Sequence, residues 1–380
     1  MRSIVLVVMV LGAASSASSG DLSSDLATLK AVGHEGSGNE AAQQAWNDIV
    51  ANDATDLSAL LTALDDANPL AANWIRAAID AIAERRLKQG KLSAQALDEF
   101  VRSTDQPPRA RRLAFEWLER VDPQAPARLI PGFANDPSLE LRREAVARLL
   151  ARGEELSGDA KDDAARKAEA IDVTRQAFAS SRDLDQIEDA AKALKALGET
   201  VDLPRHYGFI TSWKLIGPFD NRGGIGFKPE YPPEREINFV ASYPGKNGPE
   251  KNGTVKWIDH TTEDAHGMVN LNNALGKDMG CVAYAANEFY SPEARDVELR
   301  IGCICACKLW LNGKLLAEHE MYHSGNKIDQ YVAQGKLNAG RNVILIKVCQ
   351  NEQTEKWAQD WEFQLRVCDR IGTAVLSEKH

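Results

Sequence analysis

VELRIGCICACKLWLNGKLLAEHE, residues 297–320, contains the clearest β-hairpin signal of the chain. Apolar and polar residues alternate on both sides of Asn312-Gly313, a dipeptide that readily adopts the positive φ angles of a type I′ turn. We therefore predict two antiparallel strands, at residues 307–311 and 314–318, joined by this turn. A further strand is predicted just before them, at residues 297–303.

The same stretch holds half of the six cysteines, Cys303, Cys305 and Cys307, at two-residue spacing. On a strand this spacing places all three thiols on one face. Three interpretations remain open: a metal site, buried thiols that pack as small apolar groups, or disulfide bonds to the remaining cysteines, which are Cys281, Cys349 and Cys368. In an exported protein we favour cross-strand disulfides or buried thiols, because oxidation competes there with metal ligation.

Residues 319–323, His-Glu-Met-Tyr-His, match the zinc-protease string H-E-x-x-H. That string works only on a helix, where His319 and His323 would share one face and bind the metal together. Here the segment continues a predicted strand, so its histidines do not have the required spacing. We predict no metal site at this position.

The composition of the 380 residues is typical of a globular protein with two domains: 44% are hydrophobic and 26% are charged. The formal net charge of −10 argues against a nucleic-acid partner, because binding phosphates requires clustered Lys and Arg. Arginines do gather at Arg109, Arg111 and Arg112, but they alternate with helical apolar positions. We interpret them as a solvated helix face.

The first residues indicate a secretory signal peptide. Arg2 is followed by the apolar run 4–11 and by small residues that extend to Ala17, where we expect cleavage. No later segment is apolar and long enough to suggest a transmembrane helix. We therefore expect residues 1–17 to be removed and the mature chain to be secreted or periplasmic.

Residues 21–203 show helical periodicity and few strand signals, which predicts an all-α region. The predicted helices span residues 41–50, 57–64, 71–89, 94–101, 109–120, 139–151, 164–179 and 184–197. Within this region a set of residues recurs at an offset of 31: Asp105, Arg111, Arg112, Ala114 and Leu118 correspond to Asp136, Arg142, Arg143, Ala145 and Leu149.

The 31-residue offset resembles HEAT-like helical repeats, in which each helix pair buries its apolar face only by stacking on a neighbour. An irregular helical bundle is the alternative, since helix patterns alone do not determine topology. In either case we expect residues 21–203 to be a scaffold or a docking surface for a protein partner.

Residues 204–371 are rich in turn residues and in short alternating segments, which predicts an antiparallel β-sandwich followed by a tail at 372–380. Besides the three strands above, we predict strands at residues 208–216, 254–259, 267–271, 282–290, 342–349 and 362–368. The chain is therefore predicted to be a multidomain α plus β protein. The boundary between its halves is expected at Leu203-Pro204.

Four segments of this half resemble the galactose-binding-domain-like jelly roll: WKLIGPFDN (213–221), KLWLNGK (308–314), AGRNVILIK (339–347) and FQLRVC (363–368). That fold occurs in carbohydrate-binding modules and as a non-catalytic domain of many glycosidases. The family often has an acidic Ser-Asp-Asp-Gly turn before the Trp-Leu-Asn-Gly strand, and this chain has Cys303-Ile-Cys-Ala306 there instead. The whole chain also looks like secreted bacterial proteins that join helical repeats to such a sandwich.

The segment 350–361, QNEQTEKWAQDW, has the chemistry of a carbohydrate site. Flat aromatic faces stack on the C–H surfaces of sugars, while amides and carboxylates bind their hydroxyls. We predict ligand-binding roles for Trp357, Trp361, Asn351, Gln353 and Asp360, joined by Phe219, Asp220 and Asn221 from the loop after the first strand. In the alternative interpretation, one or both tryptophans close the end of the sandwich as core residues.

The sequence contains no clear grouping of a catalytic acid with a catalytic base. Glu352, Glu355, Asp360 and Glu362 offer carboxylates for glycoside hydrolysis, but sequence does not show their separation. The loop Gly223-Gly-Ile-Gly226 lacks the setting of a phosphate cradle and is predicted to be a turn. We therefore expect neither catalysis nor a cofactor.

These observations together predict an exported, non-catalytic protein that recognises a carbohydrate or another cell-surface component through its sandwich. The main alternative is a structural or protein-interaction scaffold that uses the helical region. A role as an accessory part of a glycoside-hydrolase system ranks third.

Overall fold

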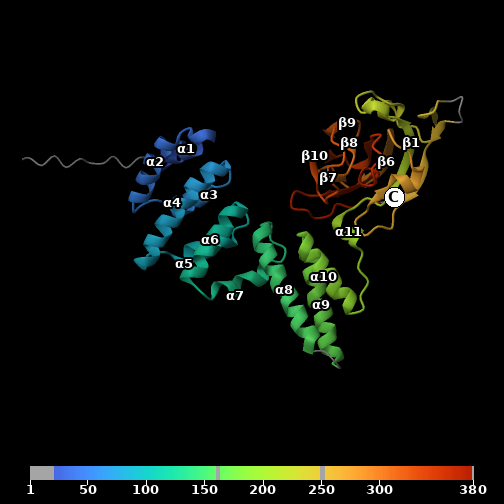
Figure 1. The fold of residues 1–380 in the computed structure, drawn as a ribbon. Coiled ribbons are helices and arrows are strands. Elements are labelled where there is room, and N and C mark those ends of the chain that lie inside the picture. Colours follow the sequence, from blue (N-terminus) through green and yellow to red (C-terminus); the bar gives the residue numbers. More distant parts are fainter. Residues whose placement is uncertain (1–20, 160–162, 249–252, 379–380) are drawn as a thin grey trace, which may run out of the picture. The chain divides into compact units, whose positions relative to one another are not determined.

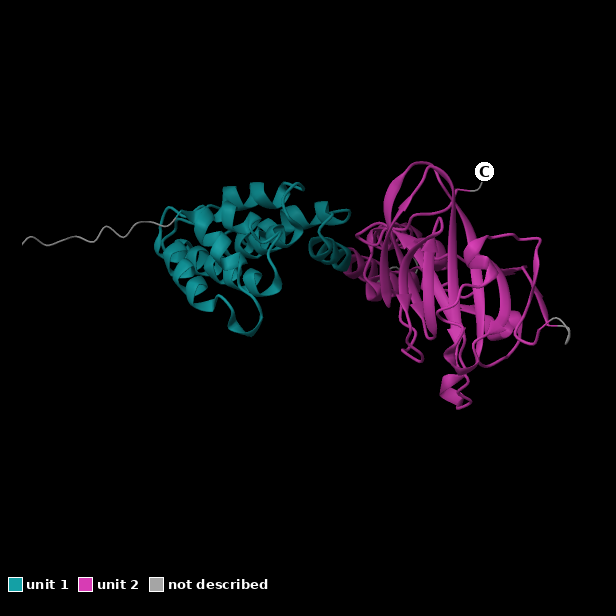
Figure 2. Cartoon of the chain, turned by 90° about the horizontal axis from the view of Figure 1, so that it is seen from above, with its two compact units in different colours: residues 1–148 teal, residues 149–380 magenta. Residues whose placement is uncertain are grey.

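The computed structural model describes residues 21–159, 163–248 and 253–378; the predicted signal peptide, residues 1–17, lies outside them. Helices form the N-terminal part of the chain and antiparallel strands the C-terminal part (Figure 1), which confirms the predicted fold class. Two compact units, residues 1–148 and 149–380, make up the chain (Figure 2). The division lies inside a helix, well before the change of composition at Leu203-Pro204.

Short helices that pack on their neighbours build the first unit. Polar side chains begin several of them: those of Asp56 and Asn68, for example, accept hydrogen bonds from amides of the first helical turn. In this unit, α1 and α7 were missed by the sequence analysis. The helices are α1 (Leu22–Lys30), α2 (Asn39–Ala51), α3 (Leu57–Thr62), α4 (Pro69–Lys88), α5 (Ala94–Arg102), α6 (Pro108–Val121), α7 (Ala125–Leu129) and α8 (Leu139–Asp159), which continues into the second unit.

The prediction that the arginines of α6 form a solvated face was wrong for Arg111, whose side chain is 1% exposed. Its guanidinium donates to both carboxylate oxygens of Asp136, at 2.7 Å each, and its Nε donates to the carbonyl oxygen of Val101 at 2.8 Å. Arg142, 31 residues later, is also buried, and its Nε donates to the Asp136 carbonyl oxygen. Paired charges with satisfied donors are tolerated in an apolar interior, which periodicity alone did not reveal.

Three helices stand before the sandwich in the second unit: α9 (Ala164–Ser180), α10 (Leu184–Ala196) and the short α11 (Leu203–Tyr207). An apolar cluster joins α10 and α11 to the strands that follow. It contains Ile187, Leu203, Tyr207 and Phe209, with Phe178 of α9 at its edge. These helices are therefore packed against the sandwich by an apolar core.

Two antiparallel sheets form the sandwich, in the strand orders β4-β1-β6-β11-β8-β9 and β10-β7-β12-β5, and β2 pairs with β3 in a small separate ribbon. The strands β2 and β10 were not predicted, and the predicted strand 254–259 is divided between two strands. The strands are β1 (Ser212–Asp220), β2 (Ser242–Pro244), β3 (Thr254–Lys256), β4 (Ile258–Thr261), β5 (Val269–Asn270), β6 (Cys281–Ser291), β7 (Arg295–Cys303), β8 (Ala306–Leu311), β9 (Lys314–His319), β10 (Tyr331–Leu337), β11 (Gly340–Gln350) and β12 (Glu362–Cys368).

The predicted hairpin is confirmed as β8 and β9, with φ angles of 52° at Asn312 and 78° at Gly313. The preceding strand β7 belongs to the other sheet, however, so residues 303–306 carry the chain from one sheet to the other. Cys303, Cys305 and Cys307 therefore do not share one strand. All three are buried in the core between the sheets.

Of the two favoured arrangements, cross-strand disulfides and buried thiols, the structure has the second: all six cysteines are buried free thiols. Register explains this: Cys349 of β11 lies opposite Val282 and Ala306, one residue out of step with Cys281 of β6 and Cys307 of β8. A one-residue offset sends side chains to opposite faces of a sheet, so these thiols do not meet. Burial raises the pKa values of Cys281 and Cys349 to about 12, which keeps both thiols protonated.

A long insertion between β1 and β4 covers the outer face of the six-stranded sheet, and a buried lysine holds it there. The ammonium group of Lys347, which is 0% exposed, donates to the carbonyl oxygens of Phe227 (3.1 Å) and Pro229 (2.8 Å) and to Glu234 Oε1 (2.8 Å). The Tyr284 hydroxyl donates to the same carboxylate oxygen. Three acceptors thus satisfy the three donors of a lysine that lies wholly inside the protein.

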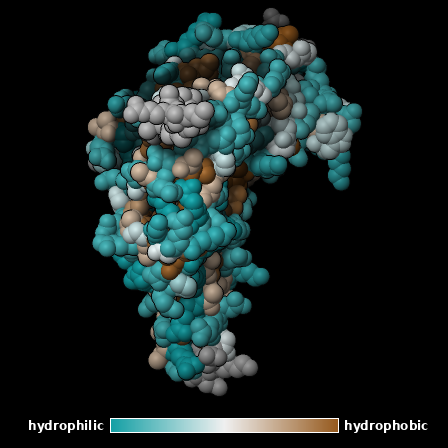
Figure 3. Space-filling model, turned by 90° about the vertical axis from the view of Figure 1, so that its left-hand side faces the viewer, coloured by the Kyte–Doolittle hydropathy of each residue, from teal (hydrophilic) through white to brown (hydrophobic). Residues whose placement is uncertain are grey.

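Most of the residues visible on the face shown in Figure 3 are hydrophilic. Across the part of the chain that the structure describes, no helix is long and apolar enough to cross a bilayer.

Candidate functional site

Several loops meet at one end of the sandwich, around the segment that the sequence analysis favoured. The buried side-chain amide of Asn221, in the loop after β1, donates to the carbonyl oxygen of Gln350 at 2.8 Å and to the Tyr322 hydroxyl at 3.2 Å. Nearby, Gly223 N donates to Glu352 Oε2 at 2.7 Å. The loops after β1, after β9 and after β11 are thus tied to one another, although they lie far apart in the sequence.

Trp357 presents an aromatic face to solvent at this end. It is 61% exposed and lies on a short 3₁₀ turn, Lys356–Ala358, which the buried Ala358 anchors. The ring of His323 meets that of Trp357 edge to face, with centroids 5.1 Å apart and an interplanar angle of 80°. Such a contact restrains the indole, while most of the residue stays open to solvent.

Amide groups border this aromatic pair. His323 Nε2 lies 3.2 Å from Asn351 Oδ1, and Asn351 Nδ2 donates to Gln353 Oε1 at 2.9 Å. His323 itself has a positive φ of 59°, a conformation that few non-glycine residues adopt. We call Trp357, His323, Asn351 and Gln353 the Trp357 surface.

Three of the predicted ligand-binding residues are buried, so those assignments are corrected. Trp361 is 0% exposed and packs in the core between the sheets, where its Nε1 donates to the Val348 carbonyl oxygen at 3.4 Å. Phe219 is 1% exposed and packs edge to face on Tyr284, beneath the insertion. Asn221 is fully buried, and its side-chain amide is hydrogen-bonded to Gln350 and Tyr322. A ligand therefore has no access to these side chains.

Asp220 and Asp360 lie at the edge of this region. Asp220 forms an ion pair with Arg222 at 2.6 Å, and the hydrogen bond from that guanidinium holds the pKa of the Asp220 carboxyl below its usual value. Asp360 is exposed, and its backbone carbonyl accepts a hydrogen bond from the Cys305 thiol at 3.4 Å. Of the eight predicted residues, Trp357, Asn351 and Gln353 thus form one surface, and these two aspartates flank it.

Two of the candidate catalytic carboxylates connect loops by accepting hydrogen bonds. Glu352 accepts from Gly223 N, and Glu362 accepts from the Asn326 side chain at 3.1 Å. The glycine-rich segment after β1 contains the 3₁₀ turn Arg222–Gly224, and Gly226 N donates to Asn221 Oδ1 at 2.9 Å. These hydrogen bonds give the carboxylates and the glycines an architectural role.

The H-E-x-x-H string is not helical. His319 ends β9 and stacks on Tyr331, with centroids 3.7 Å apart, whereas His323 faces Trp357. Among the residues that the structure describes, no three or more His, Cys, Asp and Glu side chains are grouped so as to hold a metal ion. The sequence analysis considered His323 only as a metal ligand, and its role beside Trp357, 34 residues away, has no local sequence signal.

Neither a protein-family model nor a curated protein sequence matches the chain. Among solved structures, it is similar to a family 35 carbohydrate-binding module from Clostridium thermocellum, with 18% identity over 26% of this chain and 85% of that one, and a TM-score of 0.16. It is also similar to a β-glucosidase from Kluyveromyces marxianus in complex with glucose, with 12% identity over 76% of this chain and 35% of that one, and a TM-score of 0.27.

A third similar structure is the alkylpurine DNA glycosylase of Pseudomonas fluorescens bound to DNA that contains an abasic-site analogue. Identity is 12% over 93% of this chain and 94% of that one, with a TM-score of 0.21. At these scores none of the three similarities assigns a function to the chain.

Proposed function

We propose that the sandwich binds a carbohydrate through the Trp357 surface. The observation that carries the proposal is the exposure of Trp357, whose ring is large, apolar and 61% open to solvent. The other tryptophan of this loop, Trp361, is wholly buried, so the segment divides its aromatic side chains between core and surface. An indole that is exposed and yet fixed by a neighbouring ring is suited to stack on a planar ligand.

The neighbours of Trp357 have the chemistry that sugar hydroxyls require. Carboxamides both donate and accept hydrogen bonds, as do vicinal hydroxyls, and the carboxamide of Asn351 links that of Gln353 to His323, the ring that contacts the indole. Their contacts with each other and with His323 restrict the side chains before any ligand arrives, which reduces the entropy lost on binding. A sugar ring stacked on Trp357 would thus find polar partners at its edge.

Replacing Trp357 with alanine is expected to weaken the affinity for the polysaccharide by about tenfold or more. The full-length variant should then show no measurable retention on the polysaccharide that retains the wild type. The thermal unfolding temperature should stay within about 2 °C of the wild type, because an exposed side chain contributes little to the core. Affinity electrophoresis or pull-down against a panel of insoluble and soluble polysaccharides measures the first quantity, and calorimetry measures the second. Trp357→Phe, which keeps an aromatic face, should retain part of the binding.

Trp361 serves as the internal comparison for this test. Removing this buried ring should cost about 3–5 kcal/mol of stability, so any loss of binding in Trp361→Ala reports unfolding and not a lost contact. If Trp357→Ala retains the polysaccharide as strongly as the wild type does, the binding site lies elsewhere on the chain. If the wild type binds no polysaccharide, the sandwich proposal fails and the helical scaffold, with a protein partner, takes its place.

We also propose that the chain is exported to a secreted or periplasmic location, acts without catalysis and has no nucleic-acid partner. The apolar run 4–11, the small residues that end at Ala17 and the net charge of −10 support export and the absence of a nucleic-acid partner. Expression in a bacterial host should therefore yield a mature protein that begins close to residue 18, which N-terminal sequencing checks. A product that retains Met1 would contradict export, and sugar release from a bound polysaccharide would contradict the absence of catalysis.

A further inference from the structure

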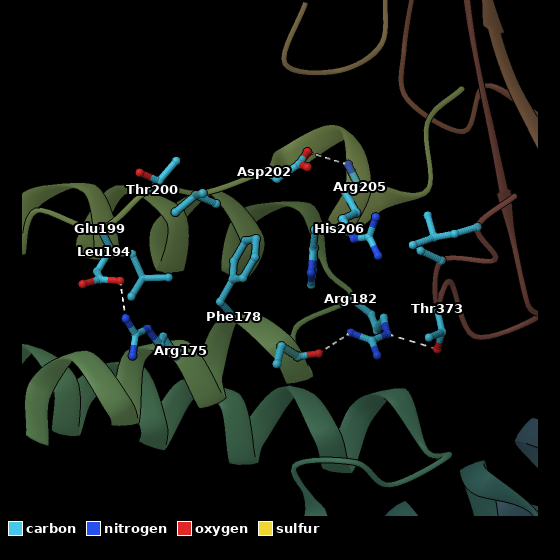
Figure 4. Close-up of a pocket in the computed structure, with 14 residues that line it drawn as sticks. Arg175, Phe178, Arg182, Leu194, Glu199, Thr200, Asp202, Arg205, His206 and Thr373 are labelled. Atoms are coloured by element: carbon cyan, nitrogen blue, oxygen red, sulfur yellow. Dashed lines mark hydrogen bonds and ion pairs between the residues drawn. The ribbon is translucent and has the colours of Figure 1, made fainter. Parts of the chain in front are cut away.

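A pocket of about 480 Å3 lies within the second unit (Figure 4), and no residue of the Trp357 surface lines it. Residues from α9, from α10, from α11 and from the C-terminal segment line it, the last of these including Thr373, Ala374 and Leu376. Its volume is within the range of small-molecule sites, which is about 300–1,000 Å3.

One wall of the pocket is apolar and aromatic. The ring of Phe178 lies against that of His206, with centroids 4.1 Å apart, and Leu194 and Val201 extend the same wall. His206 Nε2 is 3.3 Å from the Ser181 carbonyl oxygen. Burial, together with the nearby charge of Arg182, lowers the pKa of His206 to about 4, so the imidazole is uncharged at neutral pH and adds to the apolar wall.

Three arginines also line the pocket, and they differ in their partners. Arg175, at one end, forms an ion pair with Glu199. Arg182, at the other end, donates to the carbonyl oxygens of Ala179 (2.9 Å) and Ser181 (2.6 Å) and to Thr373 Oγ1 at 3.2 Å. Figure 4 shows Arg182 beyond the rings of Phe178 and His206 as seen from Arg175.

Arg205 lies at the same end as Arg182 (Figure 4), and its guanidinium forms no ion pair or hydrogen bond with any residue that the structure describes. The nearest acid in the lining, Asp202, uses its carboxylate to accept from the backbone N of Arg205, at 3.0 Å. The pocket thus combines the aromatic wall with the unpaired guanidinium of Arg205.

We propose that this pocket binds a small organic anion that has an apolar body and one carboxylate. The apolar body would lie against Phe178 and His206, and the carboxylate would face Arg205. A guanidinium presents donors in a planar fork that matches both oxygens of a carboxylate, and such a charge-assisted pair is stronger than a hydrogen bond between neutral groups. A neutral ligand of the same shape would fill the apolar part and leave Arg205 without a partner.

The test uses 3-phenylpropionate, which carries one ring and one carboxylate, and its neutral analogue 3-phenylpropanol. Isothermal titration of the full-length chain is expected to show the acid binding at least about tenfold more tightly than the alcohol, a difference of about 1.4 kcal/mol. Arg205→Gln should lower the affinity for the acid by about tenfold and leave the affinity for the alcohol unchanged. Because Arg205 is exposed and has no partner, the variant should fold normally, which its unfolding temperature checks.

The matched control is Arg235→Gln, which removes an exposed arginine of the helix α12 (Pro232–Arg235), on the insertion over the six-stranded sheet. It changes the net charge of the chain by the same amount and should leave the affinity for the acid unchanged. Equal affinities of the wild type for acid and alcohol would overturn the proposal, as would an unaltered affinity in Arg205→Gln or the absence of binding by the acid. These results are independent of whether the Trp357 surface binds a carbohydrate.

Discussion

Replacing Arg111 with alanine is expected to lower the free energy of unfolding of the helical unit by about 3–5 kcal/mol. The substitution would leave the Asp136 carboxylate, 6% exposed, without the two guanidinium donors that lie 2.7 Å away, and the Val101 carbonyl oxygen would lose its donor as well. A buried charge without a partner costs far more than the pair itself contributes. Hydrogen exchange followed by mass spectrometry should show lost protection in α5, α6 and the start of α8.

The same helix provides the control. Arg112, the next residue, pairs with Glu144 at 2.6 Å, but both side chains are about one-third exposed. Solvent screens such pairs, so Arg112→Ala should cost only about 0–1 kcal/mol. Equal losses in the two variants would show that burial of Arg111 is not what stabilises this region. A loss below about 1 kcal/mol for Arg111→Ala would contradict the role of the ion pair.

The second large effect is expected for Lys347→Met, which should cost about 3–5 kcal/mol in the second unit. Methionine has nearly the same length as lysine, but it satisfies neither the Glu234 carboxylate nor the carbonyl oxygens of Phe227 and Pro229. We expect segment 227–235 to separate from the six-stranded sheet first. Hydrogen exchange should therefore rise in that segment and in the neighbouring strand β6.

Lys214→Met is the matched variant on the same sheet, because Lys214 of β1 pairs at 2.6 Å with the exposed Asp259 of the edge strand β4. It should change stability by less than about 1 kcal/mol. Adding Glu234→Gln to Lys347→Met removes the stranded charge, so the double variant should be less destabilised than the sum of the single ones. Strict additivity would mean that the two side chains do not stabilise each other.

Local patterns predicted the regular elements of this chain well where one residue type determines the backbone. Asn312-Gly313 specified the β8–β9 turn because both residues adopt positive φ angles at little cost. The helix predicted at residues 71–89 is α4, and its start at Pro69 has equally local causes, since Pro69 has no amide proton to lose and Asn68 caps the helix. The strand β10 escaped prediction because Tyr331–Leu337 carries little apolar alternation at the edge of its sheet.

Long-range pairing decided which side chains are buried, and local patterns did not indicate it. Trp357 and Trp361 lie four residues apart in one polar segment, yet one faces solvent and the other fills the core, because β12 begins directly after Trp361 and carries it between the sheets. Arg111 and Arg112 are neighbours on one helix, and only the first meets a buried carboxylate, Asp136, which lies 25 residues further on.

The sequence by itself determined most of the helices and strands, the hairpin turn and the α plus β class, because each depends on backbone preferences and on periodicity within a few residues. The tertiary structure alone decided that the cysteines are buried free thiols, which residues form the Trp357 surface, and that the guanidinium of Arg205 has no partner among the described residues. Each of these depends on strand register or on contacts between residues distant in the chain, such as His323 beside Trp357. Side-chain chemistry is local, but burial and partnership arise only when the chain is folded.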